Sequence, residues 1–577
     1  MPKQLILAEK PSVAREIARV LGARQGRDGY IEGPQHIVTW ALGHLVTLAE
    51  PEAYGSEYKE WRLESLPMLP DRMELVVIGK TAKQFGAIRS LMSRSDVSEL
   101  VIATDAGREG ELVARWIMQK AGCRKTARRL WISSQTDRAI QEGFRALKPA
   151  AQYDSLFRSA ACRAEADWLV GLNVTRALAC KHNAQLSAGR VQTPTLSMIA
   201  RREEEIKRFV PQDYYRVAVE APGFVLIRRD KKTGAARIQN RGDAEAIAAK
   251  MAGRPVAITA VRKQRKLEPP PLAYDLTELQ RDANRLYAFS AKKTLSVLQG
   301  LYEMHKLVTY PRTDSRYITR DVAATLPERL RGISRGSYAK IAAGLLRAGA
   351  RATSRLVDDA KVTDHHAILP TEQPLDMGRL DNDEKRVYDL VAKRFLAIMS
   401  APFEYEETEV AADVGGERAT ARGRIVKAAG WREVYAGAAG GVGIAPGAGG
   451  SAGAGAGAGG AAGMAGAGFG GAAGSSGMVG AGRAGGAVGA RGFGTGVTGG
   501  VGAGLGALAA AADDDDGEDG DPGGDGGGKD ALGGAFGGGQ RLPPLNSGDR
   551  LVSRSVGILA GKTKPPARYT EATLLTA

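Results

Sequence analysis

A tyrosine and an arginine stand two residues apart in the segment LVTYPRTDSRYI, residues 307–318. Pro311, between Tyr310 and Arg312, holds the preceding backbone extended. A phenol has a pKa of about 10, so Tyr310 attacks phosphorus at neutral pH only if positive charge stabilises its phenolate or a base removes its proton. Arg312 can supply that charge, and its planar fork also matches phosphate. Taken alone, the segment fits equally a half-buried strand tyrosine beside a surface arginine.

Acidic side chains follow two short apolar runs in the first part of the chain. Glu9 comes directly after QLILA, and Asp105 and Glu109 follow LVIA. A helical pattern follows each run, which predicts two strands of an open α/β sheet that binds ligands at the carboxyl ends of its strands. The spacing of Asp105 and Glu109 lets a tight turn into a helix aim both carboxylates at one point. Such a group suits Mg²⁺, although acids also favour the first helical turn through the helix dipole.

The composition indicates a large protein with a polyanionic partner. Its 577 residues exceed what one core can hold, so several domains are expected. The formal net charge of +16 suits nucleic acid or an anionic membrane surface. No apolar run is long enough to span a bilayer and no signal-peptide core begins the chain, so we expect a cytoplasmic protein with no membrane partner. The three cysteines lie far apart, which argues against a disulfide framework or a zinc ribbon.

Residues 436–540 differ from the rest of the chain. They are almost entirely Gly and Ala, with an acidic patch from Asp513 to Asp530. The tract has few large side chains to bury and high backbone entropy, so we expect a disordered insertion. The acidic patch is interpreted as solvated, and competition with DNA for the basic surface is the second interpretation.

Two further stretches mix apolar helix positions with side chains that hold phosphates and sugars. They are RAEADWLVGLNVTR, residues 163–176, and SAGRVQTPTL, residues 187–196. Without a longer match, the second stretch would fit a helix capped by Ser187 with Arg190 on its surface. Strand-like alternation occupies residues 214–257 and returns beyond residue 401.

These motifs occur in the order found in type IA DNA topoisomerases, and the chain resembles the bacterial topoisomerase III group of that family. Glu9 together with residues 105–111 resembles the Toprim domain, and SAGRVQTPTL is close to a type IA signature. The block that ends at Tyr310 resembles the gate domain bearing the nucleophilic tyrosine. DHHAILPTE, residues 364–372, contains the family's His-x-Ala-Ile turn.

The resemblance implies a mixed α/β and α+β fold, with an N-terminal Rossmann-like Toprim domain and a toroidal core of four domains. It also implies a chain that stops early in its DNA-binding domain, because family members usually continue past this point. The implied boundaries are Toprim 1–150, helical DNA-binding domain 151–212, middle domain 213–267, tyrosine gate domain 268–400, return of the middle domain 401–435, insertion 436–540, end of the middle domain 541–565, and truncated re-entry into the DNA-binding domain 566–577.

The implied activity is that of an ATP-independent isomerase. It cleaves one DNA strand through a 5′-phosphotyrosine, passes a strand and religates, which relaxes negative supercoils and decatenates DNA. In this reading Tyr310 is the nucleophile, and Glu9 protonates the leaving 3′-oxygen and later acts as base. Lys10 and Arg312 offset phosphate charge. His365 supports the scissile phosphate.

The resemblance also assigns Mg²⁺ to Asp105, Glu109 and Glu9. Gly107 stands where the family's commonest metal motif, DxDxE, has its second Asp, so that position lacks the usual ligand and one metal ion is favoured over two. Glu111 is the alternative ligand, although its spacing points it along the helix.

Partners and DNA contacts follow from the same resemblance. We expect single-stranded or underwound DNA, a helicase partner, a monomeric state and a location at the nucleoid. His366 is expected at the surface. The expected DNA-binding residues are Arg190, Gln192, Ser187, Arg176 and Thr193.

Two other functions remain open from the sequence. A truncated, catalytically weak protein that still binds single-stranded DNA would explain the early end of the chain together with its basic motifs. A Toprim nuclease or primase would explain Glu9 and Asp105, but it leaves Tyr310 and SAGRVQTPTL without a role.

Overall fold

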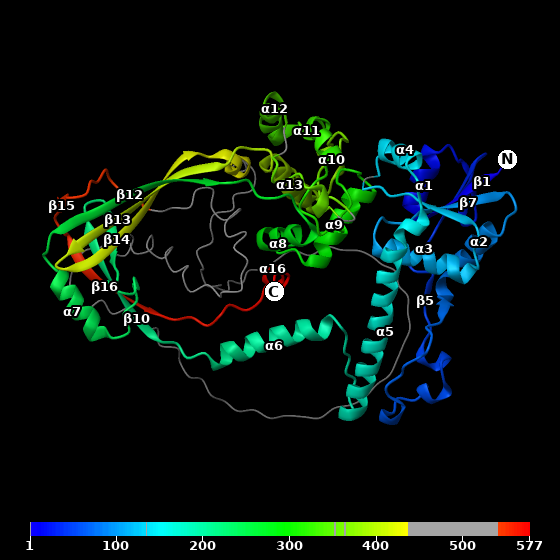
Figure 1. The fold of residues 1–577 in the computed structure, drawn as a ribbon, viewed down its shortest axis with the longest axis horizontal. Coiled ribbons are helices and arrows are strands. Elements are labelled where there is room, and N and C mark those ends of the chain that lie inside the picture. The colour runs from blue at the N-terminus through cyan, green and yellow to red at the C-terminus, as the bar shows by residue number, and fades with distance from the viewer. Residues whose placement is uncertain (1, 134, 351–352, 363–364, 437–539) are drawn as a thin grey trace, which may run out of the picture.

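The computed structural model describes residues 2–133, 135–350, 353–362, 365–436 and 540–577. Apart from its end residues, Ala436 and Gln540, the predicted Gly/Ala insertion lies outside the described residues. Figure 1 shows an N-terminal sheet, a group of helices, an antiparallel sheet and two long helices following one another around a ring. This is the arrangement that the toroidal prediction requires.

The N-terminal sheet has the order β2-β3-β4-β1-β7-β8-β9, and its central strands β4, β1, β7 and β8 are parallel. Helices cover both faces, so β1 is a continuous apolar run rather than an alternating one. Leu5 and Leu7 pack with α2 and α3 on one face, whereas Ile6 and Ala8 pack with α1 and α4 on the other. The bounds are β1 Lys3–Ala8, α1 Pro11–Val20, β2 Gln25–Arg27, β3 Tyr30–Glu32, β4 His36–Trp40, α2 Ala82–Met92, β7 Val97–Ala103, α3 Arg108–Ala121, β8 Thr126–Arg129, α4 Asp137–Arg145 and β9 Lys148–Pro149.

Two long helices leave this sheet. Helix α5, Asp154–His182, packs its first turns on the N-terminal core and ends where Asn183 adopts a left-handed conformation, with φ of 44°. Helix α6, Gln192–Arg208, has no buried residue. A separate two-stranded sheet consists of β5 Val46–Leu48 and β6 Leu75–Val77, which come between β4 and α2 in the sequence.

The antiparallel sheet has the order β15-β12-β13-β14-β11-β10-β16 and is assembled from stretches far apart in the sequence. Strand β16 pairs with β10 along its whole length, and the Gln212 N–H donates to Thr563 Oγ1, 351 residues later. Helix α7, Arg241–Met251, packs Ala244 and Met251 into the core of this sheet. The strands are β10 Asp213–Ala221, β11 Phe224–Arg228, β12 Val256–Glu268, β13 Phe403–Val414, β14 Glu417–Ala428, β15 Arg550–Leu551 and β16 Ser555–Lys562.

The remaining helices pack around α13, whose Val387, Tyr388 and Phe395 are buried in the largest apolar cluster. We call this group, residues 268–400, the tyrosine unit, and we call residues 2–150 the N-terminal unit. The short α16, Glu571–Leu574, contacts α8, and its Glu571 carboxylate accepts the Ala291 N–H. The helices of the tyrosine unit are α8 Leu276–Tyr287, α9 Ala291–Glu303, α10 Arg320–Ala324, α11 Leu326–Ile333, α12 Ala339–Arg347 and α13 Asn382–Ala397.

Candidate active site between the N-terminal unit and the tyrosine unit

Two extended segments hold the tyrosine and the histidine side by side. The Thr309 N–H donates to the Leu369 carbonyl at 2.9 Å, and the Leu369 N–H donates to Thr309 Oγ1 at 2.9 Å. Thr313 Oγ1 donates to the carbonyl of His365 at 3.0 Å. These bonds fix the backbone on both sides of Tyr310 relative to the His365 backbone.

Tyr310 lies in the boundary between the two units and is 6% exposed. Its N–H donates to the Ser133 carbonyl at 2.9 Å, and its ring stacks on His365 with centroids 4.1 Å apart. Burial raises the pKa of the Tyr310 phenol well above its ordinary value, and the charges of Asp105 and Glu9 raise it further. The phenol is therefore protonated in the closed protein at neutral pH.

Two of the three predicted metal ligands lie together. The Asp105 N–H donates to Glu9 Oε2 at 3.0 Å. Burial, followed by the charge of Glu9, raises the pKa of Asp105 to about 7. The Asp105 carboxyl therefore keeps its proton to a higher pH than a free aspartate does.

Glu109 does not complete the predicted set. It occupies the first turn of α3, where its carboxylate forms an ion pair with His44 at 3.5 Å. Among the described residues, no group of three or more His, Cys, Asp or Glu side chains is placed to hold a metal ion. Glu109 follows Asp105 by four residues, but its carboxylate pairs with His44, which lies outside this segment.

Glu111, the alternative ligand, is also committed elsewhere. It is fully buried and forms an ion pair with the fully buried Arg129 at 2.6 Å. Arg129 also donates to the Asp105 carbonyl at 2.6 Å and to the Thr104 carbonyl at 2.7 Å. The pair thus fixes the end of β7 and the start of the Asp105 loop, a role that the sequence reasoning missed. The available signal was a basic residue directly before the apolar residues Leu130 and Trp131, in RRLW.

Two glycines shape the loop between Asp105 and α3. A Cβ at Gly110 would lie 1.9 Å from the Asp105 carbonyl oxygen, so only glycine permits this close approach. A Cβ at Gly107 would lie 3.9 Å from the Tyr310 hydroxyl. The position that lacks the usual Asp therefore borders the hydroxyl of the predicted nucleophile.

Lys10 and Arg312, the two residues predicted to offset phosphate charge, lie in different surroundings. Lys10 forms an ion pair with Glu303 at the end of α9, so it joins the N-terminal unit to the tyrosine unit. Arg312 is exposed, and its charge opposes the increase in the pKa of Tyr310. Glu303 was not anticipated from the sequence, because its contact with Lys10 spans 293 residues.

The two histidines of the HHAIL segment are both buried. His365 is 3% exposed, its Nε2 contacts the Ala106 carbonyl, and its Nδ1 lies 2.9 Å from Ser133 Oγ. Burial lowers the pKa of His365 to about 4. The expectation that His366 lies at the surface is wrong, because it is 7% exposed and its Nδ1 lies 2.7 Å from the Ala367 carbonyl. The local pattern of His-His gave no sign that both rings point inward.

Comparison with known proteins identifies the family to which the chain belongs. The protein-family model described as DNA topoisomerase matches residues 151–441, and the model described as Toprim domain matches residues 4–135. The chain belongs to the DNA topoisomerase family. The predicted family and the predicted Toprim fold are thereby confirmed.

Relatives of this topoisomerase chain are named DNA topoisomerase 3. The chain is 56% identical over 435 residues to the protein of Bacillus licheniformis, and these residues cover 75% of this chain and 60% of that relative. It is 54% identical to the Bacillus subtilis protein over the same length and shares. The chain therefore spans about 60% of the length of the curated relatives that it matches.

A solved structure shows the same fold. Full-length topoisomerase I of Thermotoga maritima superposes with a TM-score of 0.62 at 21% identity, over 99% of this chain and 74% of that one. Within the described ranges of our topoisomerase chain, we find no helix whose length and apolar character would allow it to cross a membrane.

The predicted DNA-binding residues of this topoisomerase chain fall into two groups. Ser187, Gln192 and Thr193 are exposed, and Arg190 is exposed and paired with Asp167 at 2.8 Å. Arg176 is instead 3% exposed. Its guanidinium donates to the Tyr58 carbonyl at 2.6 Å, so its charge is used inside the protein and not on the surface where a DNA contact was expected.

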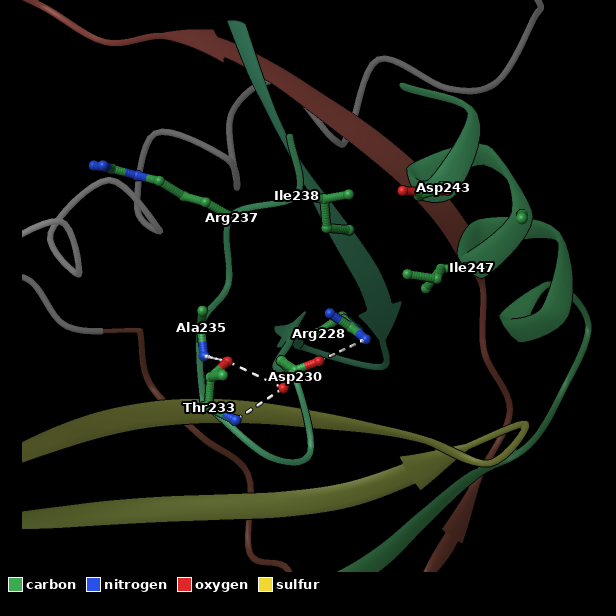
Figure 2. A pocket seen from close by; sticks show the side chains of 9 residues that line it. Arg228, Asp230, Thr233, Ala235, Arg237, Ile238, Asp243 and Ile247 are labelled. Carbon is green, nitrogen blue, oxygen red and sulfur yellow. Dashed lines mark hydrogen bonds and ion pairs between the residues drawn. The ribbon is translucent and has the colours of Figure 1, made fainter. Parts of the chain in front are cut away.

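A cavity of about 540 Å³ lies in the antiparallel sheet unit of the topoisomerase chain. Figure 2 shows Arg228 and Asp230 side by side in its lining, joined by an ion pair. Arg228 lies 3.7 Å from Asp230 and 3.2 Å from Glu417, so its charge is already balanced. None of the residues that line this cavity belongs to the N-terminal unit or the tyrosine unit, and it is separate from the candidate active site.

Proposed function

We propose that this chain is a type IA topoisomerase that cleaves and religates one DNA strand through Tyr310 without ATP. The observation that carries the proposal is the position of the Tyr310 hydroxyl, which borders the Gly107 loop beside the Asp105 and Glu9 carboxyl groups. A nucleophile, an acid-base pair and the exposed Arg312 guanidinium meet at this boundary.

The covalent step would use Tyr310, Glu9 and Asp105. The Tyr310 oxygen attacks the phosphorus, the new O–P bond forms, and the bond from phosphorus to the 3′-oxygen breaks. The pair formed by Glu9 and Asp105 gives one proton to the 3′-oxygen, with Glu9 as the donor. The pair recovers a proton from the phenol, so protons balance. A pKa of about 7 at Asp105 would let this carboxyl gain and lose a proton near neutral pH.

Religation reverses these transfers. The 3′-hydroxyl gives its proton to Glu9 and attacks the phosphotyrosine, the bond from Tyr310 to phosphorus breaks, and the Glu9 and Asp105 pair returns one proton to the Tyr310 oxygen. One phosphodiester is exchanged for another in each direction, so no ATP is required. Between the two steps, separation of the tyrosine unit from the N-terminal unit would let a strand pass.

Asp105 would hold a single Mg²⁺ ion, and Glu9, whose carboxylate accepts the Asp105 N–H, would remain the acid-base group. Mg²⁺ commonly takes one or two carboxylates and keeps several waters, so one protein carboxylate is enough. The bound ion would supply positive charge to the scissile phosphate. Glu109 would join the site only by leaving His44, and the residues present give no support for a second ion.

DNA recognition would extend from the boundary to the exposed polar residues near α6. Ser187, Arg190 and Gln192 would hold the phosphates of a single-stranded or underwound segment. We further propose the domain division given above, a monomer that works with a helicase, both relaxation and decatenation as activities, and action on chromosomal DNA in the cytoplasm.

Covalent capture tests this proposal. The purified chain is incubated with Mg²⁺ and a 3′-labelled single-stranded oligonucleotide, denatured and separated on a gel beside Tyr310→Phe. We expect a labelled, protease-sensitive adduct with the wild type and none with the variant. DNA binding without an adduct in either protein would refute the enzymatic proposal and leave a DNA-binding member of the family.

A further inference from the structure

Four aromatic rings form one column that ends at the predicted nucleophile. Tyr153 stacks on Trp131 with centroids 4.7 Å apart and an interplanar angle of 15°. Trp131 lies 5.9 Å from His365, again at 15°, and His365 lies 4.1 Å from Tyr310 at 26°. Nearly parallel rings at these separations form a continuous stack.

The column crosses the boundary that must separate for a strand to pass. Trp131 follows β8, and Tyr153 closes the turn before α5, so both belong to the N-terminal side. His365 and Tyr310 belong to the tyrosine unit. The junction between the two halves is therefore the contact between the Trp131 indole and the His365 imidazole.

The N-terminal half of the column is held in place. The Arg129 guanidinium, itself fixed by Glu111, lies over the Trp131 ring at 5.1 Å. Tyr153 stacks on the same Trp131 ring, 4.7 Å away. Ser133, two residues after Trp131, accepts the Tyr310 N–H through its carbonyl. The N-terminal unit thus presents a flat ring and a hydrogen-bond acceptor to the tyrosine segment at fixed positions.

His365 transmits this placement to the nucleophile. Both of its ring nitrogens have partners, the Ala106 carbonyl and Ser133 Oγ, and these partners belong to the N-terminal unit. The imidazole therefore cannot turn without losing them. Its ring is nearly parallel to both Trp131, 5.9 Å away, and Tyr310, 4.1 Å away. Neither nitrogen is available to take the phenolic proton, so the ring acts on Tyr310 through its flat face.

We propose that Trp131 and Tyr153 are positioning residues that set the angle of the Tyr310 ring for attack each time the tyrosine unit closes on the N-terminal unit. They act through His365 and touch neither the phosphate nor the reacting atoms. This inference rests on the proposed function, because it assigns a task within the same reaction. Misplacing a reacting group by about 1 Å costs up to about 100-fold in rate, so loss of a supporting ring should be visible in the rate.

Matched substitutions test the column. Trp131→Leu removes the flat ring, whereas Trp131→Phe keeps one. Phe144→Leu removes a half-buried ring of the same unit that pairs with His36 outside the column. Each variant is assayed for the rate of adduct formation and the rate of religation at saturating oligonucleotide. DNA affinity is measured with each substitution combined with Tyr310→Phe.

We expect Trp131→Leu to slow both rates at least tenfold with DNA affinity within twofold of the parent, and Trp131→Phe to restore the rates to within threefold. Wild-type rates in Trp131→Leu would overturn the inference. Equal slowing by Trp131→Phe or by Phe144→Leu would also overturn it, because the effect would then be one of general packing.

Tyr153 provides a second test if Trp131→Leu does not fold. Tyr153→Leu should slow both rates by about threefold to tenfold, and Tyr153→Phe, which keeps the ring and loses only the hydroxyl, should match the wild type. Equal rates in these two variants would contradict the column. Failure of the proposed function looks different, because the wild type itself would then form no adduct that depends on Tyr310.

Discussion

The raised pKa of Asp105 predicts that the folded chain loses stability as the pH rises. In the unfolded chain this carboxyl has its ordinary pKa of 3.8, whereas burial and Glu9 raise the pKa in the folded chain to about 7. The folded chain keeps a proton that the unfolded chain loses, so the stability contributed by the protonated group is fully present below pH 3.8 and is lost as the pH rises through 7.

The size of this effect follows from the two pKa values. Their difference corresponds to at most about 4 kcal/mol, and relaxation of the site and entry of water reduce this to about 2 kcal/mol. Between pH 5 and pH 8, Asp105→Asn should therefore gain about 1 to 2 kcal/mol relative to the wild type. For a domain of the size of the N-terminal unit, the midpoint of thermal unfolding would move by about 2 to 6 °C.

Thermal unfolding at pH 5 and pH 8 measures this difference directly. The matched control is Asp71→Asn, which removes an exposed carboxylate of the same unit and should follow the wild type at both pH values. Added Mg²⁺ should recover the stability that the wild type loses at pH 8 and should have a smaller effect on Asp105→Asn. The reasoning would be refuted if the stability of the wild type and of Asp105→Asn changed with pH in the same way. The pKa of Asp105 would then be the same in the folded and the unfolded chain.

Two further predictions concern the supports of the Asp105 loop. Glu111→Gln should destabilise the chain by about 3 to 5 kcal/mol in thermal unfolding, because it leaves the Arg129 charge buried without its partner, and a loss below about 1 kcal/mol would contradict the buried pair. Gly110→Ala should reduce adduct formation at least tenfold, because its Cβ would force the Asp105 carbonyl away. Adduct formation at the wild-type rate would show that the loop adjusts freely.

Local pattern was enough to predict the fold class and the family. Apolar runs ending in acids indicated the strands β1 and β7, and the ordered motifs indicated the Toprim domain that the family comparison confirms. These features depend on residues close together in the sequence. Their local chemistry is sufficient to define a strand, a turn and a helix start.

The contacts of the site could not be predicted in the same way. Glu109 meets His44, Lys10 meets Glu303 and Arg176 turns inward because of residues that are distant in the sequence. The sequence of a motif does not show whether a charged side chain faces solvent or a buried partner. The direction of each side chain depends on how the units pack against each other. The spacing of residues in the sequence does not specify that packing.

Both edges of the antiparallel sheet are supplied by the last part of the chain, β15 and β16. During synthesis on a ribosome, the N-terminal unit can fold as soon as β9 has emerged. The outer side of β12 stays unpaired until residue 551 is made, and that of β10 until residue 562 is made. The order of synthesis therefore imposes an order of folding. At about 5 to 20 residues per second, translation of residues 437–539 alone extends that exposure by roughly 5 to 20 s, a period in which unpaired strand edges are open to aggregation.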